Sequence, residues 1–232
     1  TPILANSQLE ELKNSEAFKS KVIDILFTEN LENSLNEVCR QADEAIAEGT
    51  SLIILSDRNM SENEVAIPSV LAASALHQHL IREGLRTKAS IIVETGEVRE
   101  VHHFAVLLGY GVDAINPYLV FSTYQEAVQE GTLPFTYQEA VKKYLYAMTE
   151  GVVKVMSKMG ISTVQSYRGA QIFEAVGISS DVIDRYFTGT VSQLGGIGLE
   201  TIAEEAKLRH TDAYKETTDK TLESGSNFQW RH

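Results

Sequence analysis

The chain has 232 residues, of which 43% are hydrophobic and 22% are charged, and its formal net charge at pH 7 is -12. This is the composition of an ordinary globular protein that is long enough to bury a full core. The acidic balance argues against nucleic-acid and anionic-membrane surfaces, because both require clustered lysine and arginine. The one cysteine, Cys39, excludes a disulfide within the chain and a zinc or iron–sulfur site held by several thiolates.

The first 50 residues are predicted to form a helical lead-in segment. Ser7 to Glu10 has the spacing of a capping box, in which side chains bond the free amides at the start of a helix. Apolar residues then recur every three or four positions over 31–46, which indicates one buried helix face. Gly49 is expected to end this helix.

From residue 51 onward, short apolar strands alternate with helices. Unbroken apolar runs of about five residues are typical of strands buried on both faces. Strands are predicted at 51–55, 89–93, 114–116 and 161–164. Helices are predicted at 68–83, 101–108, 123–130, 137–159, 167–176 and 199–208. This order predicts an α/β fold of parallel βαβ units, as an open sheet or a partial TIM-like barrel, because a complete barrel needs eight strands.

These patterns divide the chain into the lead-in segment 1–50, an α/β domain at 51–210 and a tail at 211–232. The tail ends SGSNFQWRH, in which Phe228 and Trp230 alternate with polar residues as they would in a strand. We interpret this tail as the opening of a next domain.

Two pairs of histidines are the first candidates for a metal site. His77 and His79 lie on a predicted helix, and so do the neighbours His102 and His103. Residues one or two apart on a helix point in different directions, so neither pair is expected to hold one metal ion. Glu100 and His103 have the spacing found in di-iron bundles, but a second such motif is lacking. We expect one of the neighbouring histidines to be packed and the other to be exposed.

The best-placed polar residues follow the predicted strands. Asp57 and Arg58 come after the first strand, Asn116 ends the third, and Gln165 and Arg168 follow the fourth. Ligands of parallel α/β folds bind beyond the carboxyl ends of the strands, where these five residues would meet. The guanidinium of Arg168 suits a carboxylate or a phosphate. The alternative is that these residues cap helices and pair with one another.

Long strings of the sequence resemble the central domain of glutamate synthase, over about residues 50–210 and more loosely outside them. The terminal FQWRH looks like the start of the family's FMN-binding domain, and Gln78 stands where we expect a third histidine. The strings are LIILSDR (52–58), AIPSVLAASALHQHLIREGLRTKASIIVETGEVREVHHFAVLLGYGVDAINPYL (66–119), ISTVQSYRGAQIFEAVGI (161–178) and FTGTVSQLGGIGLETIAEEA (187–206).

The resemblance implies a role within a much larger enzyme. Glutamate synthases convert glutamine, 2-oxoglutarate and a reductant into two glutamates, and ammonia travels between an amidotransferase site and an FMN site. This chain would be the later part of the central domain, a non-catalytic connecting domain that helps to organise the ammonia path. FMN and a 3Fe-4S cluster would lie in other parts of the enzyme, and the tail would lead into the FMN-binding domain.

The expected partners are therefore the amidotransferase and FMN-binding domains of the same polypeptide, with ammonia as the tunnelled intermediate and with neither nucleic acid nor membrane. The expected location is the cytoplasm, or the plastid stroma of a photosynthetic eukaryote. The alternative reading is a free-standing α/β enzyme or ligand-binding module that uses Asp57, Arg58, Asn116, Gln165 and Arg168.

Overall fold

The computed structural model describes residues 1–215 of the chain. Its helices are α1 (Asn6–Lys13), α2 (Leu31–Ala47), α3 (Ser69–Arg82), α4 (Val101–Gly109), α5 (Tyr118–Gln129), α6 (Tyr137–Lys158), α7 (Val164–Tyr167), α8 (Ser180–Tyr186) and α9 (Leu199–Ala213). Its strands are β1 (Ser20–Asp24), β2 (Leu26–Phe27), β3 (Leu52–Ser56), β4 (Val65–Ala66), β5 (Ser90–Glu94), β6 (Ala114–Asn116), β7 (Glu174–Ile178) and β8 (Val191–Ile197). No helix in this part of the chain is both long and apolar enough to span a membrane.

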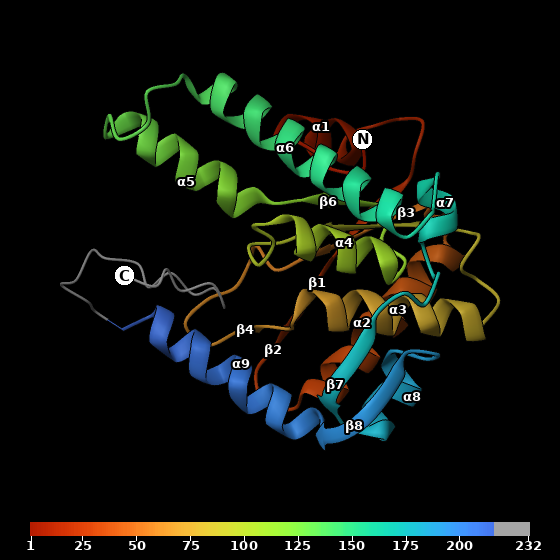
Figure 1. The fold of residues 1–232 in the computed structure, drawn as a ribbon. Helices are drawn as coiled ribbons and strands as arrows, with labels where there is room; N and C mark the ends of the chain where they lie inside the picture. The colour runs from red at the N-terminus through yellow and green to blue at the C-terminus, as the bar shows by residue number, and fades with distance from the viewer. Residues whose placement is uncertain (216–232) are drawn as a thin grey trace.

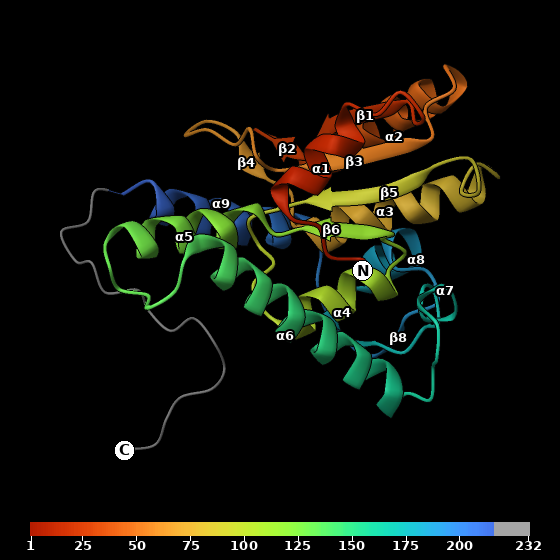
Figure 2. The same cartoon turned by 90° about the horizontal axis from the view of Figure 1, so that it is seen from above.

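A four-stranded parallel sheet forms the centre of the fold, in the order β1-β3-β5-β6. The strands can be followed in this order in Figure 2. Beyond β6, Ile3 forms a parallel bridge with Ile115, and the amide of Leu4 donates to the carbonyl of Ile115 at 2.8 Å. The first residues of the chain therefore continue the sheet past β6, which leaves β1 at the opposite edge.

Both faces of the sheet are covered, but unequally. Ile53 and Leu55 of β3 belong to the main core, which they share with α2, α3 and α4. Leu52 and Ile54 point to the other face, where Leu9 of the short helix α1 packs on them. This arrangement explains the unbroken apolar run of β3, because successive side chains enter opposite cores.

The predicted α/β fold with parallel βαβ units is confirmed, but the fourth strand of the sheet is not the predicted one. It is β1, which lies inside the predicted helical segment 1–50 and pairs with β3. The sequence of β1, SKVID, has one fully buried residue, Ile23, because β1 lies at the sheet edge. An edge strand lacks the apolar run that marked the inner strands, and this is why periodicity missed it. The boundary at residue 50 stays a prediction.

The predicted strand at 161–164 and helix at 167–176 were wrong. Gly160 has a left-handed φ of 71°, which ends α6, and Thr163 then begins α7 by accepting a hydrogen bond from the amide of Ser166. After α7 the chain becomes the strand β7, which pairs in parallel with β8. A single helical turn that starts at a threonine cap is too short to show the apolar periodicity of a helix. The strand predicted around Phe228 lies outside the described residues.

A helical hairpin of α5 and α6 packs beside α4, across the top of Figure 1. Tyr144 anchors it: its ring meets Phe121 and Phe104 at centroid distances of 6.1 and 6.3 Å. Its hydroxyl donates to the carbonyl of Arg99 at 3.1 Å. Further along α6, Gly151 allows α4 to approach closely. A Cβ at residue 151 would lie 2.9 Å from Val101 Cγ1 and closer still to Val101 Cγ2.

Replacing Gly151 with alanine is therefore expected to lower the free energy of unfolding by about 1–3 kcal/mol through overpacking against Val101. Chemical denaturation measures this change. At a solvent-exposed position inside a helix, replacing glycine with alanine would instead stabilise the fold by up to ~1 kcal/mol. The matched control is Gly151→Ala in a Val101→Ala background, where most of the clash is gone and alanine is expected to be neutral or stabilising. Stabilisation by Gly151→Ala with Val101 intact would contradict the close packing of α4 on α6.

Candidate functional site

A buried carboxylate, Glu94, joins several elements at the carboxyl end of the sheet. Its side chain is 2% exposed and accepts a hydrogen bond from Ser56 Oγ at 2.9 Å. Lys13 Nζ from α1 and Arg58 Nη1 from the loop after β3 lie 3.2 and 3.1 Å from its two oxygens. The guanidinium of Arg58 also lies 4.7 Å from the ring centroid of Tyr118. The predicted ligand-binding residue Arg58 is thus held by a neighbouring carboxylate.

Asp57 lies at the same end and is fully buried. Thr95 Oγ1 donates to its carboxylate at 2.5 Å, and the amide of Gly96 donates at 3.1 Å. Burial raises the pKa of Asp57, while hydrogen bonds from Thr95, Tyr118 and Gly96 act in the opposite direction. Because its oxygens are already bonded, Asp57 fixes the turn that follows β5.

Asn116 is the third predicted residue at this end, and it is also fully buried. Its Nδ2 donates to the carbonyl of Leu4 and to Oδ1 of Asn6, both at 3.0 Å. Asn116 therefore ties β6 to the start of α1. Together with Asp57 and Arg58, it lies where the sequence placed it, and the contacts of all three within residues 1–215 are those of fold-stabilising groups.

A cavity of about 680 Å³ opens beside Asp57. Its walls come from β4, the start of α4 and helix α9, and they are mostly apolar, with Val98, Leu107 and Ala206 among them. Its charged lining is balanced, since Asp57 and Glu97 stand with two arginines, Arg99 and Arg209. This cavity has the position and size typical of a ligand pocket in a parallel α/β fold.

Gln165 and Arg168 lie elsewhere, so the five predicted residues do not gather in one site. Both belong to the segment of α7, and Arg168 forms an ion pair with Asp113, the residue before β6. Gln165 accepts a hydrogen bond from the same guanidinium. They are therefore at the amino end of the sheet, opposite Asp57. The expected gathering was wrong because it required the missing strand at 161–164.

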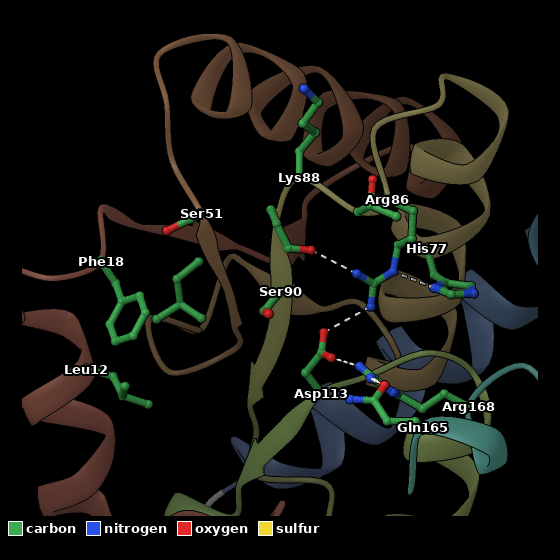
Figure 3. A pocket seen from close by; sticks show the side chains of 13 residues that line it. Leu12, Phe18, Ser51, His77, Arg86, Lys88, Ser90, Asp113, Gln165 and Arg168 are labelled. Atoms are coloured by element: carbon green, nitrogen blue, oxygen red, sulfur yellow. Dashed lines mark hydrogen bonds and ion pairs between the residues drawn. The ribbon is translucent and has the colours of Figure 1, made fainter.

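Asp113 is the centre of this second cluster, and Figure 3 shows it between two arginines. Arg86 Nη2 donates to Asp113 at 2.9 Å, and the amide of Ile91 donates to the same carboxylate at 2.8 Å. Arg86 also donates to the carbonyls of Ala89 and Gly111, at 2.8 and 2.7 Å. Sequence reasoning missed Arg86 and Asp113 because it examined only the residues that follow strands, whereas these two precede strands.

His77 completes the cluster as an acceptor. Arg86 Nε donates to its Nδ1 at 2.9 Å, and a Cβ on Gly111 would overlap the imidazole ring. Burial, together with the charges of Arg86 and Arg168, lowers the pKa of His77 to about 4. The imidazole is therefore neutral at pH 7 and packs as part of the fold.

The other histidines also have separate structural partners. His79 bonds Asp43 of α2 at 2.8 Å, so it faces away from His77 as predicted. The Nδ1 of His103 accepts from the amide of Arg99 at 3.2 Å, at the start of α4. His102 is exposed and His103 is half-buried, as expected. No group of three or more histidine, cysteine, aspartate or glutamate side chains in residues 1–215 is placed to hold a metal ion.

Comparison with known proteins identifies the family of the chain. A family model described as the glutamate synthase central domain matches residues 1–179. The chain belongs to the glutamate synthase central domain family. The resemblance found in the sequence is therefore confirmed.

Relatives of this glutamate synthase segment are far longer than the chain itself. The NADPH glutamate synthase large chain of Bacillus subtilis (strain 168) is 64% identical, and the match covers 100% of this chain and 15% of that protein. The chloroplastic ferredoxin-dependent glutamate synthase of Spinacia oleracea is 39% identical, with coverages of 100% and 15%. The NADH glutamate synthase of Schizosaccharomyces pombe is 40% identical, with coverages of 97% and 11%. The chain thus spans a small part of each relative.

The fold also resembles a solved flavoprotein structure. A flavocytochrome b2 mutant with benzoylformate matches with a TM-score of 0.50 and 15% identity, covering 95% of this chain and 46% of that one. At this identity the likeness concerns the fold alone. The neighbour is a TIM-barrel protein, which agrees with a partial TIM-like barrel in the glutamate synthase central domain.

Replacing Glu94 with glutamine is expected to lower the free energy of unfolding by about 1–3 kcal/mol, because two cations lose their buried partner. This expected loss of stability is smaller than the full cost of breaking a buried ion pair, since Arg58 is 47% exposed and water screens its charge. Glu10→Gln is the matched control: Glu10 also pairs with Lys13 but is 58% exposed, and its loss should change stability by less than ~0.5 kcal/mol. Equal effects in urea denaturation would contradict the joining role of Glu94.

The pH dependence of folding is expected to report on His77. Its pKa of about 4 in the folded chain lies below the ordinary ~6.5. Between these values the unfolded chain binds a proton that the folded chain does not, so stability falls as pH falls, by up to ~1.4 kcal/mol per pH unit. Above pH ~6.5 the contribution of His77 is constant. A plot of the free energy of unfolding against pH should be shallower over this window for the His77→Gln variant than for the parent chain. An unchanged slope would contradict a neutral, half-buried His77.

Proposed function

We propose that this chain acts as a non-catalytic connecting domain in a longer glutamate synthase, between the amidotransferase and FMN sites, and that it helps to organise the path of ammonia. The parent reaction is the conversion of glutamine, 2-oxoglutarate and a reductant into two glutamates. The relatives named above differ in electron donor, so the proposal leaves the donor open.

The observation that carries this proposal is an apolar sheet face that the described chain leaves uncovered. The strands β7 and β8 form a two-stranded parallel sheet, in which Val176 is paired with Leu194. These two side chains are 70% and 64% exposed, and Val191 and Ile197 beside them are 56% and 42% exposed. Parallel sheets are almost always buried on both faces. A cover supplied by the rest of the polypeptide would satisfy this requirement.

The reactive groups of the parent enzyme are assigned to other parts of the polypeptide. Burial raises the pKa of Cys39 to about 11, so this thiol is a poor nucleophile. A 3Fe-4S cluster needs more thiolates than one cysteine provides. We therefore place FMN and the cluster outside this chain and interpret residues 211–232 as the lead into the FMN-binding domain. The expected partners are these domains, and the expected location is the cytoplasm or a plastid stroma.

The free-standing enzyme is a weaker alternative. It depended on one site made of Asp57, Arg58, Asn116, Gln165 and Arg168. Because Gln165 and Arg168 lie at the opposite end of the sheet from the other three, such a site would need a different set of residues.

The connecting role can be tested in the full-length polypeptide with a Leu194→Lys substitution, which places a charge on the uncovered face of β8. Glutamine hydrolysis and glutamate synthesis from added ammonium are expected to remain. Synthesis from glutamine should fall by at least about tenfold, equivalent to ~1.4 kcal/mol, and ammonia should escape into solution.

The matched control is Ile81→Lys, because Ile81 is an apolar side chain of α3, outside β7 and β8, that is 48% exposed. This variant is expected to keep all three activities. Unchanged coupling in the Leu194→Lys enzyme, with no release of ammonia, would overturn the proposed connecting role of this face.

A further inference from the structure

A second cavity, of about 760 Å³, lies beyond the amino ends of the central strands. Ser51 and Ser90 line it where β3 and β5 begin, and Asp113 lines it just before β6. It is thus separated by the length of the sheet from the cavity beside Asp57. Figure 3 shows Asp113 with Arg86 and Arg168 at one side of the strand that carries Ser90, and Leu12 and Phe18 at the other side.

The charge in this cavity is not balanced. Among residues 1–215, three cations line it, Arg86, Lys88 and Arg168, against one carboxylate, that of Asp113. His77 adds no charge at pH 7, because its imidazole accepts a hydrogen bond from Arg86 and is neutral. An excess of positive charge is unexpected in a chain whose formal net charge is -12. Since the side chain of Arg168 is only 18% exposed, water screens this excess incompletely.

The two arginines differ in how many of their hydrogens are already bonded. Arg86 donates from Nε, Nη1 and Nη2 to His77, Ala89, Gly111 and Asp113, so its guanidinium is nearly saturated. Arg168 bonds Asp113 and Gln165 through its two terminal nitrogens. A guanidinium carries five hydrogens, so Arg168 keeps donors for a further acceptor.

The opposite wall indicates the chemical class of that acceptor. Leu12, Phe18 and Leu52 give an apolar surface, and Phe18 is 50% exposed although its ring is large and apolar. A bare anion would leave this ring in water, whereas a hydrocarbon chain would cover it. The planar fork of an arginine fits a carboxylate well.

We propose that this cavity binds a small organic carboxylate, with the carboxylate against Arg168 and the hydrocarbon part against Leu12 and Phe18. Lys88 stands at the rim and adds long-range attraction. The proposal is independent of the connecting role, because the cavity and the uncovered face of β7 and β8 share no residue.

Titration of the 232-residue chain with hexanoate tests the proposal, with amide chemical shifts as the readout. Hexanoate is expected to bind saturably, with shifts centred on Phe18, Ser90 and Asp113. Hexan-1-ol has the same hydrocarbon chain but no charge, and inorganic phosphate has charge but no hydrocarbon. Each is expected to bind at least about tenfold more weakly, because hexan-1-ol lacks the charged hydrogen bond and phosphate lacks the apolar contact with Leu12 and Phe18. Shifts centred elsewhere, or phosphate or hexan-1-ol bound as tightly as hexanoate, would overturn the proposal.

Two variants localise the site. Arg168→Gln should weaken hexanoate binding by at least about tenfold. Lys88→Gln removes a side chain whose ammonium has no ion-pair partner in residues 1–215, so the fold should persist while binding weakens by about two- to fivefold. Lys154→Gln, on the exposed face of α6, is the matched control and should bind as the parent chain does. Circular dichroism shows whether the Lys88→Gln variant is folded. Unchanged hexanoate affinity in this folded variant would overturn the proposed site, and so would unchanged affinity in Arg168→Gln.

Discussion

The burial of parallel strands on both faces is the constraint on which this structure depends. In β3 and β5 the side chains alternate between two cores, and each core needs its own cover. Three helices cover one face, while the eight-residue helix α1 and the first residues of the chain cover the other. The strands β7 and β8 obey the same constraint only in part, since Val176 and Leu194 remain exposed. A domain that leaves this requirement unmet is suited to packing against other parts of a larger protein.

Two carboxylates fix the two ends of the central sheet in the same way. At the carboxyl end, Glu94 holds Lys13 of α1 and Arg58 of the following loop. At the amino end, Asp113 holds Arg86 before β5 and Arg168 of α7. In each case one carboxylate joins segments that are far apart in sequence. The difference is that the Glu94 carboxylate is 2% exposed and also accepts a hydrogen bond from the Ser56 hydroxyl, whereas the surplus charge around Asp113 faces an open cavity. The first arrangement stabilises the fold, and the second is the one suited to a ligand.

The sequence predicted the inner strands and the long helices well, because their apolar patterns are unambiguous. It missed β1 because an edge strand with one buried residue does not show the apolar run of an inner strand. A strand was predicted at 161–164 because Ile161, Thr163 and Val164 are β-branched residues that favour strands, although Thr163 serves as a helix cap there. The candidate site divided for the same reason: Asp57 follows β3 and Asn116 ends β6, so both lie at the carboxyl end of the sheet, while Arg168 follows the short helix α7 and not a strand. Arg86 and Asp113 precede strands, where no ligand-binding residues were expected. They are 27 positions apart, and their ion pair becomes visible only in the folded chain.

We propose that other parts of a longer glutamate synthase cover the apolar face of β7 and β8. Hydrogen–deuterium exchange of residues 174–178 and 191–197, compared between the 232-residue chain and the full-length polypeptide, would show whether they do. These strands are expected to open easily in the chain alone, and their exchange should slow by at least about a hundredfold in the full-length polypeptide, equivalent to ~2.7 kcal/mol of local stability. The strands β3 and β5 should change much less, because their covers lie within the chain. Equal exchange of β7 and β8 in both proteins would show that the rest of the polypeptide does not cover this face.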